Sequence, residues 1–484
     1  MRLTCEPKSV FGFFERISAI PRGSGNEKGI SDWLVAFAKE KGLWVHQDKA
    51  LNVIVKKPGT AGFENVGAVI LQAHMDMVCE KNVATEHDFE KDPIRLVVEG
   101  DFIRAEGTTL GADNGAALAM ILALLDSADI PHPPLEVLVT TGEEVGLLGA
   151  AEVDGEMFGG KSLLNLDSGE EGFFCVCCAG GARVDLSFEM KSVPLPDGFI
   201  VKNLNIKGLK GGHSGVDITK ERGNGIRLMA RALKILHGKF DILFVFPNGG
   251  AKDNAIPREA EVGIAFPKAK EEEFAAEVGR IEKTFKDEYA ISDEGFEMSF
   301  SDRAGFAGMV YHPDDAARVM NALLLLPNGV QAMNLVLKDL PETSMNIGVI
   351  SSSEDRVSIG CSLRSSVASR KEMLLEQVNA VAEATCAKVK VSGVYPAWEY
   401  RRDSALREMV MGVFAEMFGR EALICGTHGG LECGILSQKI DGVDIVSFGP
   451  DIYEMHTPNE RMSISSFART WDFLLKLLER LGSR

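Results

Sequence analysis

The sequence predicts an α/β protein in which a mainly parallel sheet flanked by helices carries an inserted α+β domain. Short runs rich in valine, isoleucine and leucine alternate with helix-length segments in the first part of the chain, which is typical of parallel strands joined by helices. The pattern changes after about Asp185, and the first pattern resumes from about Asp403. The second domain is therefore predicted to interrupt the first.

The chain has 484 residues, which is too long for one ordinary hydrophobic core and favours two domains. We predict that residues 1–185 and 401–484 form the first domain and that residues 186–400 form the inserted one. No low-complexity linker separates them, so short hinge crossings are expected near Asp185 and Tyr400.

Composition excludes several classes of partner. The net charge of −18 argues against a surface for nucleic acid or for an anionic membrane. No apolar run is long enough to span a bilayer, and Met1–Val10 lacks the apolar core of a signal peptide. The nine cysteines are scattered without the spacing of a zinc finger, which favours reduced thiols and a cytoplasmic location.

The N-terminal region is predicted to contain two helices and two strands. The helices fit Ser9–Ala19 and Lys28–Lys41, and the strands fit Leu43–Gln47 and Asn52–Lys56. Pro21–Glu27, between the helices, is predicted to be a turn-rich loop because it combines proline, glycine, serine and asparagine.

The segment Val66–Leu71 is apolar and is predicted to be a buried strand. His74 and Asp76 follow at its C-terminal end, and two residues apart in extended chain their side chains share one face. The imidazole could bind a metal ion while the carboxylate orients it. A single His-x-Asp pair is common, so this interpretation depends on the motifs that follow.

A glycine-rich loop runs into a long apolar helix over Gly107–Leu125. Asp113 lies just before this helix, near its positive end, where it could bind a cation or simply cap the helix. The loop matches neither the dinucleotide-binding pattern nor the P-loop, which disfavours nucleotide binding.

Two further apolar strands end in acidic residues. The segment Leu135–Ala150 is a strand that breaks into a turn with Glu143 and Glu144, whose side chains point in different directions. The strand Ser162–Ser168 ends in Asp167. Parallel sheets bind ligands at the C-terminal ends of their strands, so these acids are expected to converge with the preceding histidine.

The remaining elements complete both domains. In the inserted domain, helices fit Gly223–Leu236, Glu271–Tyr289, Asp314–Leu325 and Lys371–Thr385, and strands fit Leu204–Lys207, Ser344–Ser351, Arg356–Arg364 and the segments around Phe244 and Glu261. These form two similar strand-helix-strand stretches. After the insertion we predict a helix over Ala405–Phe418, a strand over Val443–Phe448 and a last helix over Ser465–Leu481.

Two histidines and three carboxylates stand out as candidate metal ligands: His74, Asp113, Glu144, Asp167 and His456. This set suits a pair of divalent ions bridged by one carboxylate, with zinc favoured and manganese or cobalt as alternatives. Glu143 then remains as a general base for metal-bound water. Taken one by one, these residues could also be helix caps, surface acids or core histidines.

Six motifs in this order, AHMD, GADNG, TGEEVGLLGA, LDS, GGHSG and MHTPNE, resemble the dinuclear-zinc metallopeptidases that include carnosinase, glutamate carboxypeptidase and peptidase T. The likeness covers most of the chain. GLKGGHSG, THGGLE and the long insertion are most similar to the subgroup of bacterial Xaa-His (aminoacyl-histidine) dipeptidases. Many relatives carry a different Gly-Gly loop in place of Thr427–Glu432.

The resemblance implies roles for the first domain, which would be catalytic and zinc-peptidase-like. Asp113 would bridge the two metals. The ligands that complete the two sites would be His74 with Asp167, and Glu144 with His456. Asp76 would support the first histidine, and Glu143 would be the base.

The inserted domain would be a lid or dimerisation domain. His213, in GGHSG, would reach the developing oxyanion. Asn254 and Arg364 would contact the substrate from the lid, and His428 would do so from the catalytic domain. The alternative for the last three is that they are ordinary surface polar residues. Arg364 ends an alternating apolar strand, and its planar fork matches a substrate carboxylate.

The expected activity is metal-dependent hydrolysis of unblocked dipeptides, in particular Xaa-His dipeptides such as carnosine. Two alternatives stay open: an amidohydrolase that removes an acyl group from amino acids with the same metals, and a non-catalytic metal- or peptide-binding protein. A homodimer is expected, although a lid long enough to form an internal pseudo-dimer would also allow a monomer.

Overall fold

The computed structural model describes residues 3–303, 306 and 308–483, and the chain divides into two compact units. The first unit contains the residues up to Cys178, Trp398–Gly426 and the residues from Leu431 onwards. The second contains Ala179–Ala397 and Thr427–Gly430. The first crossing comes before Asp185 because the residues around it form one continuous strand of the second unit, Gly180–Glu189.

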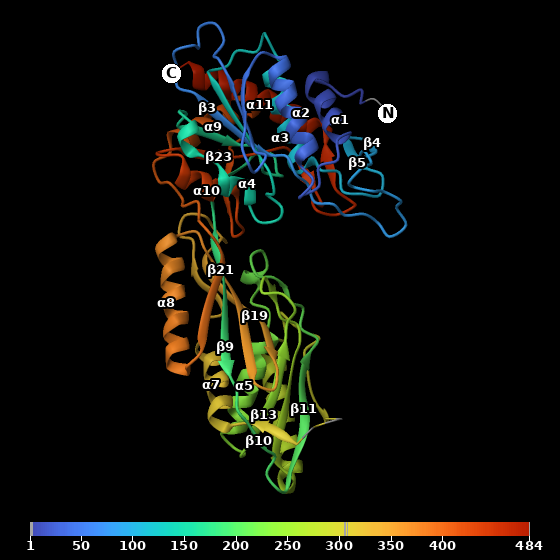
Figure 1. Cartoon of the computed structure of the whole chain (residues 1–484), viewed down its shortest axis with the longest axis vertical. Coiled ribbons are helices and arrows are strands. Elements are labelled where there is room, and N and C mark those ends of the chain that lie inside the picture. The colour runs from blue at the N-terminus through green and yellow to red at the C-terminus, as the bar shows by residue number, and fades with distance from the viewer. Residues whose placement is uncertain (1–2, 304–305, 307, 484) are drawn as a thin grey trace. The chain divides into compact units, whose positions relative to one another are not determined.

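The first unit is built on an eight-stranded sheet (Figure 1). Its strands, in spatial order, are β1 (Trp44–Gln47), β2 (Val53–Lys57), β6 (Leu135–Thr140), β3 (Val69–His74), β7 (Ser162–Asn165), β23 (Asp444–Ser447), β8 (Phe173–Cys178) and β22 (Leu423–Thr427). The four central strands, β6, β3, β7 and β23, are parallel, whereas β1, β2 and β8 pair antiparallel. The sheet is therefore mixed, with a parallel centre.

Helices cover both faces of this sheet. The helices of the first unit are α1 (Lys8–Ser18), α2 (Lys28–Glu40), α3 (Ala112–Asp126), α4 (Leu148–Glu152), α9 (Ala405–Phe418), α10 (Glu432–Lys439) and α11 (Ile464–Gly482). Successive residues of β3 point to opposite faces, so Val69 and Leu71 join the core that includes α1, α3 and α11, while Ile70 joins a smaller core with residues of α10. Burial on both faces explains why these strands are continuously apolar.

Smaller elements complete the first unit. A four-stranded sheet contains β24 (Ile452–Tyr453), β25 (Arg461–Ser463), β5 (Phe102–Ala105) and β4 (Leu96–Glu99), and the short 3-10 helix η1 spans Gly155–Met157. Side-chain caps begin two of the late helices: Ser404 accepts the amide of Arg407 at the start of α9, and Ser463 accepts that of Ser466 at the start of α11.

The second unit contains a nine-stranded sheet in which every defined pairing is antiparallel. Its strands, in spatial order, are β16 (Glu297–Asp302), β11 (Phe199–Lys207), β15 (Ala260–Pro267), β13 (Leu243–Gly249), β19 (Pro341–Ser352), β20 (Arg356–Ser365), β9 (Gly180–Glu189) and β21 (Lys388–Tyr395), with β18 (Gly329–Met333) paired to β19. The helices α5 (Gly225–His237), α6 (Glu271–Glu288), α7 (Pro313–Leu325) and α8 (Ala368–Thr385) pack against it (Figure 1).

This sheet repeats one arrangement twice. The first half uses β11, α5, β13, β15, α6 and β16, and the second half uses β9, α7, β19, β20, α8 and β21. The spatial order of strands within the first half is β16-β11-β15-β13, and the second half mirrors it as β19-β20-β9-β21. The halves meet where β13 pairs with β19 at Gly249 and Ile350. The predicted pair of similar stretches thus forms one continuous sheet with an internal pseudo-twofold arrangement.

The second unit also contains two short strand pairs and two 3-10 helices. They are β10 (Ser192–Pro194) with β17 (Met309–Tyr311), β12 (Gly212–His213) with β14 (Ala255–Ile256), η2 (Ile218–Lys220) and η3 (Lys268–Lys270). Across the described part of the chain, no helix combines the length and the apolar character that a bilayer crossing requires.

Candidate metal centre

The parallel strands β3, β6 and β7 end at the same edge of the first unit's sheet. His74 is the last residue of β3, Glu143 and Glu144 follow β6, and Asp167 follows β7. Asp113 lies in the first turn of α3, after Gly111, whose φ of 68° is a conformation that favours glycine.

The structure brings all five predicted ligands together. The Nε2 atom of His74 lies 3.0 Å from Oδ1 of Asp113 and 3.6 Å from Oδ1 of Asp167. The Nε2 atom of His456 lies 3.2 Å from Oδ2 of Asp113 and 3.2 Å from Oε1 of Glu144. Each carboxylate oxygen of Asp113 therefore faces a different imidazole, which is the arrangement that a bridging carboxylate between two cations requires.

The charges of this cluster fit divalent cations. Asp113 and Glu144 raise the pKa of His456 to about 10. Burial opposes protonation of His74, yet the nearby Asp167 and Asp113 carboxylates raise its pKa well above the usual value. Both imidazoles thus sit in an environment that strongly favours positive charge. Potential ligand atoms of the sets His74–Asp113–Asp167 and Asp113–Glu144–His456 lie within 4.8 Å of one another, close enough to hold one ion each.

Asp76 supports the centre in two ways. Its carboxylate accepts hydrogen bonds from the backbone amides of Glu143 and Glu144, at 3.1 and 3.3 Å. The Nδ1 atom of His74 lies 3.1 Å from the carbonyl oxygen of Asp76 and 3.4 Å from its Oδ1. This places Asp76 where it can orient the imidazole of His74.

Glu143 belongs to the same cluster, with His74 and Glu144. Burial raises the pKa of Glu143 well above its usual value, and the nearby Asp167 carboxylate adds to the effect. A carboxyl group whose pKa is raised holds a proton more readily, which suits it to accepting and returning one.

Two residues that the sequence analysis missed fix the backbone around Asp113. Glu460 is buried, and its carboxylate accepts the amides of four consecutive residues, at 2.8 Å for Leu110, 3.0 Å for Gly111, 2.8 Å for Ala112 and 3.3 Å for Asp113. Asn114 donates to the carbonyl of Leu166 and accepts the amide of His74. Their motifs, MHTPNE and GADNG, were noted for their ligands only.

A third missed residue is Glu432, which is fully buried in the first unit. Its Oε2 accepts hydrogen bonds from Nε2 of Gln72 at 2.6 Å and from Oγ1 of Thr140 at 2.7 Å. Burial raises the pKa of Glu432 to about 8. The residue links β3 to β6 just below the strand ends, and its signal in the sequence was the THGGLE motif.

The second unit contains the four residues predicted to contact substrate, His213, Asn254, Arg364 and His428. His213, in β12, accepts the backbone amides of Gly215 and Val216 at its Nδ1, at 3.2 and 3.3 Å. Because Nδ1 acts as an acceptor, the ring proton of a neutral His213 resides on Nε2. Asn254 lies beside it, since its carbonyl accepts the amide of Ser214.

Arg364, near the end of β20, is held from one side only. Its Nη1 donates to the hydroxyl of Tyr395 at 3.3 Å and to the carbonyl of His428 at 3.2 Å. Its Nε is buried and has no hydrogen-bond partner among the residues that the structure describes. A buried donor of this kind is suited to a ligand oxygen.

The predicted placement of His428 in the first domain is wrong. The short segment Thr427–Gly430 belongs to the second unit, because the amide of Ala179 donates to the carbonyls of Thr427 and Gly429. The His428 side chain is also buried, with Nε2 2.7 Å from the hydroxyl of Ser344. These long-range hydrogen bonds have no local signature in the sequence.

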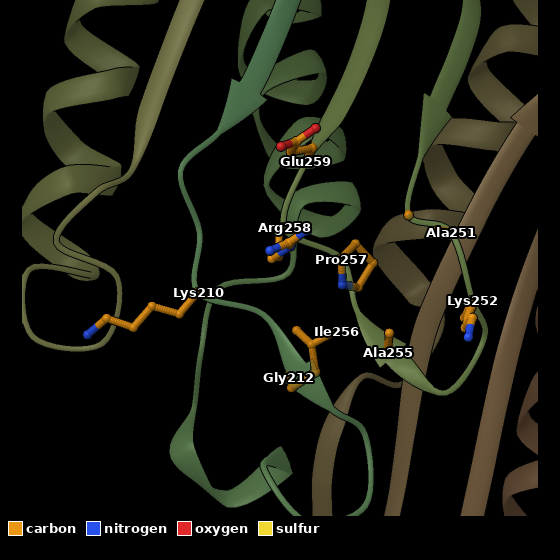
Figure 2. A pocket seen from close by; sticks show the side chains of 10 residues that line it. Lys210, Gly212, Ala251, Lys252, Ala255, Ile256, Pro257, Arg258 and Glu259 are labelled. Atoms are coloured by element: carbon orange, nitrogen blue, oxygen red, sulfur yellow. The ribbon is translucent and has the colours of Figure 1, made fainter. Parts of the chain in front are cut away.

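A separate pocket lies next to the β12–β14 pair (Figure 2). It is lined by Lys210, Gly212, Gly250, Ala251, Lys252, Ala255, Ile256, Pro257, Arg258 and Glu259. Figure 2 shows Lys210 and Lys252 on opposite sides of Arg258, and their charged ends do not converge. None of the predicted site residues lines this pocket.

Known proteins resemble this chain over its whole length. The model of a family described as Peptidase family M20/M25/M40 matches residues 70–480. The cytosol non-specific dipeptidase of Escherichia coli (strain K12) is 36% identical over 480 residues, which cover 99% of this chain and 98% of that protein. The crystal structure of aminoacylhistidine dipeptidase from Vibrio alginolyticus is 38% identical, with a TM-score of 0.93 over 99% of this chain and 97% of that one. Aminopeptidase PepT from Bacillus cereus, 18% identical, shares the fold with a TM-score of 0.58 over 99% of each chain.

Proposed function

Because the chain belongs to peptidase family M20/M25/M40, we propose that it is a metal-dependent dipeptidase that hydrolyses unblocked dipeptides, including Xaa-His dipeptides such as carnosine. The observation that carries this proposal is the position of Asp113, whose two carboxylate oxygens face His74 and His456 separately. The names of the two most similar relatives described above, a non-specific and an aminoacylhistidine dipeptidase, support the substrate class.

Two divalent ions, zinc in the first place and manganese or cobalt as alternatives, would be held by the five ligand residues. One site would use His74 and Asp167, the other Glu144 and His456, and Asp113 would serve both. When bound, the ions would supply Lewis acidity toward the peptide carbonyl and the attacking water.

The chain's own residues would move the proton. Glu143 would accept a proton from the water as the water oxygen attacks the peptide carbonyl carbon. As the carbon–nitrogen bond breaks, the same carboxyl group would give the proton to the departing nitrogen. The products would be two free amino acids, and Glu143 would end in its starting state.

The polar residues of the second unit would contact the substrate. The Nε2 proton of His213 would be donated to the developing oxyanion, since its Nδ1 already accepts two amides. Arg364 would bind the C-terminal carboxylate of the dipeptide through its unpartnered Nε edge. Asn254 would add a polar contact, while the buried His428 would hold Arg364 through its carbonyl.

The second unit would act as a lid, and the enzyme would work in the cytoplasm, as the name of the Escherichia coli relative suggests. We expect a homodimer formed through the second unit, with a monomer as the alternative because this unit already repeats its sheet internally. Sedimentation equilibrium over a range of protein concentrations distinguishes the two states.

A substrate panel tests the function. It contains carnosine, other Xaa-His dipeptides, dipeptides without histidine, N-acyl amino acids and a tripeptide, each tested with and without added zinc. Elemental analysis of the active protein measures its metal content. We expect cleavage of free dipeptides and two metal ions per chain. Preferential cleavage of N-acyl amino acids would favour an amidohydrolase, and no turnover above the metal-free control would favour a binding protein.

A further inference from the structure

The loop Pro21–Glu27 connects α1 to α2 and precedes the residues matched by the family model, which begin at position 70. None of its residues is a metal ligand. It nevertheless contains two buried charged side chains, Arg22 and Glu27, with exposed fractions of 2% and 7%. Buried charges need partners. The side chains of Arg22 and Glu27 make hydrogen bonds to the segments that carry the proposed metal ligands.

Arg22 connects two of those segments. Its Nη1 donates to the carbonyls of Met75 and Asp76, both at 3.0 Å, and its Nη2 donates to the carbonyl of Gly111. The first pair of carbonyls follows His74 directly, and Gly111 lies two residues before Asp113. The guanidinium of Arg22 therefore fixes the spacing between the backbone segment that follows His74 and the one that precedes Asp113.

Ser24 reaches the same centre through a side chain. Its hydroxyl donates to Oδ2 of Asp76 at 2.7 Å, and its backbone amide donates to the carbonyl of Met77 at 3.4 Å. The carboxylate of Asp76 also accepts the amides of Glu143 and Glu144. The Ser24 hydroxyl thus completes the set of donors that sets the angle of this carboxylate beside His74.

Glu27 contacts the turn that carries Glu143 and Glu144. Its Oε1 accepts the amide of Gly142 at 3.1 Å, immediately before Glu143 and Glu144. Gly142 has a φ of 58°, so the chain turns sharply here, and the hydrogen bond holds that turn. The loop therefore contacts the backbone or side chains next to His74, Asp113 and the two glutamates.

We propose that Pro21–Glu27 is the positioning element of the metal centre, with Ser24 as its most direct member because it bonds the carboxylate that orients His74. This inference rests on the proposed function only in taking the cluster as a metal site. Outer partners of metal ligands typically change metal affinity or activity by roughly ten- to a hundredfold when removed. The loop residues would act through the ligands and would not touch the substrate.

The test compares Ser24→Ala and Ser24→Thr with a matched control, Ser31→Ala. Ser31 lies in α2 and is fully buried. Its hydroxyl donates to the carbonyl of Leu51 at 2.6 Å and accepts a hydrogen bond from Nε2 of Gln47 at 2.7 Å, so its removal costs two internal hydrogen bonds. The measurements are zinc affinity by competition with a fluorescent chelator, kcat and KM for a dipeptide, and thermal stability of each metal-free protein.

We expect Ser24→Ala to weaken zinc binding by roughly ten- to a hundredfold. It should lower kcat by a larger factor than it changes KM. Ser24→Thr keeps the hydroxyl and should retain most of the affinity. Ser31→Ala should lose stability while its zinc affinity stays at the wild-type value. Equal zinc affinity in Ser24→Ala and Ser31→Ala would overturn the inference.

A second pair of variants tests the loop independently. Glu27→Gln keeps an oxygen acceptor for the amide of Gly142, whereas Glu27→Ala removes it. Hydrogen exchange at Gly142 should accelerate in Glu27→Ala and stay slow in Glu27→Gln, with zinc affinity following the same order. Unchanged exchange and affinity in Glu27→Ala would contradict the role of the loop, whereas a wild-type protein that binds no metal would contradict the proposed function instead.

Discussion

The histidines of the candidate metal centre, His74 and His456, and those near Arg364, His213 and His428, lie in opposite electrostatic surroundings. In the first unit, carboxylates surround His74 and His456 and raise the pKa of both. In the second unit, burial and the positive charge of Arg364 lower the pKa of His213 and His428. Imidazole titrates near neutrality, so its surroundings decide which form is present.

The difference shows what each group is suited to bind. The first group has an excess of negative charge, which favours cations. The second group has neutral imidazoles next to an arginine, which favours the oxygens of an anionic or polarised ligand. If each group depends on its own kind of charge, removing the metal ions should affect the first group, and removing the charge of Arg364 should affect the second.

Metal removal should separate the two units most clearly. A strong chelator should abolish dipeptide hydrolysis. It should also destabilise the first unit, because the ions would bind only the folded form. The loss in the free energy of unfolding should be about 4 kcal/mol when free metal was at a thousand times its dissociation constant. Hydrogen exchange should accelerate in α3 and stay unchanged in β20. A metal-saturated chelator is the control, and full activity after chelation would exclude a metal-dependent reaction.

Substitution of the base tests the first group without removing a ligand. Glu143→Gln should lower kcat by roughly a hundred- to ten-thousandfold, because it removes proton transfer while metal content stays at two ions per chain. Glu144→Gln is the matched variant, which should weaken one metal site. If Glu143→Gln turned over at the wild-type rate, another group would have to be the base.

Arg364→Ala tests the charge of the second group. A charge-assisted bidentate contact is worth on the order of 2–4 kcal/mol, so kcat/KM for free dipeptides should fall roughly thirty- to a thousandfold. Wild type should discriminate against dipeptide amides, and the variant should lose most of that preference. Arg356→Ala, at the exposed beginning of the same strand, is the control. Equal cleavage of dipeptides and amides by the wild type would return Arg364 to a structural role.

The smallest effect concerns pH and His428. The pKa of His428 is about 3 in the folded chain, against about 6.5 in the unfolded one, so the unfolded state binds an extra proton between these values. The free energy of unfolding should therefore rise with pH across this window, by at most about 1.4 kcal/mol per pH unit from this residue. Its contribution is fully present above about pH 6.5 and disappears as the pH falls toward the folded-state pKa.

Chemical unfolding of wild type and His428→Gln between about pH 4 and 7 measures this slope. The variant should show a shallower dependence of the free energy of unfolding on pH than wild type. Identical slopes in the two proteins would mean that His428 accepts a proton in the folded state as readily as in the unfolded one.

Local pattern accounts for the parts of this structure that the sequence could predict. The apolar run before His74 and the buried strand before Asp167 follow from side-chain periodicity, and the parallel arrangement brings their ends together. The candidate ligands His74, Glu144 and Asp167 could be chosen because they lie at or just after the ends of strands, and Asp113 because it lies at the start of a helix. The helix Ala405–Phe418 has the bounds that the sequence predicted.

Features that depend on distant partners could not be predicted in this way. The strand β8 (Phe173–Cys178) and the strand β21, which pairs with β9, were not predicted. The buried state of Arg22 follows from carbonyls more than fifty residues away, while its own neighbourhood indicates only a turn. The assignment of His428 to the wrong unit has the same cause, because its segment is held by hydrogen bonds to the distant residues Ala179, Ser344 and Arg364.

The mirrored order of strands in the second unit has an evolutionary consequence. A sheet assembled from two identical subunits must carry every amino-acid change on both sides of its symmetry axis. Here one gene encodes both halves, so each could diverge independently: the half with β11 to β16 contains His213 and Asn254, whereas the half with β19 and β20 contains Arg364. A mutation in one half therefore leaves the residues of the other half unaltered, so the two sets of polar side chains can change one residue at a time.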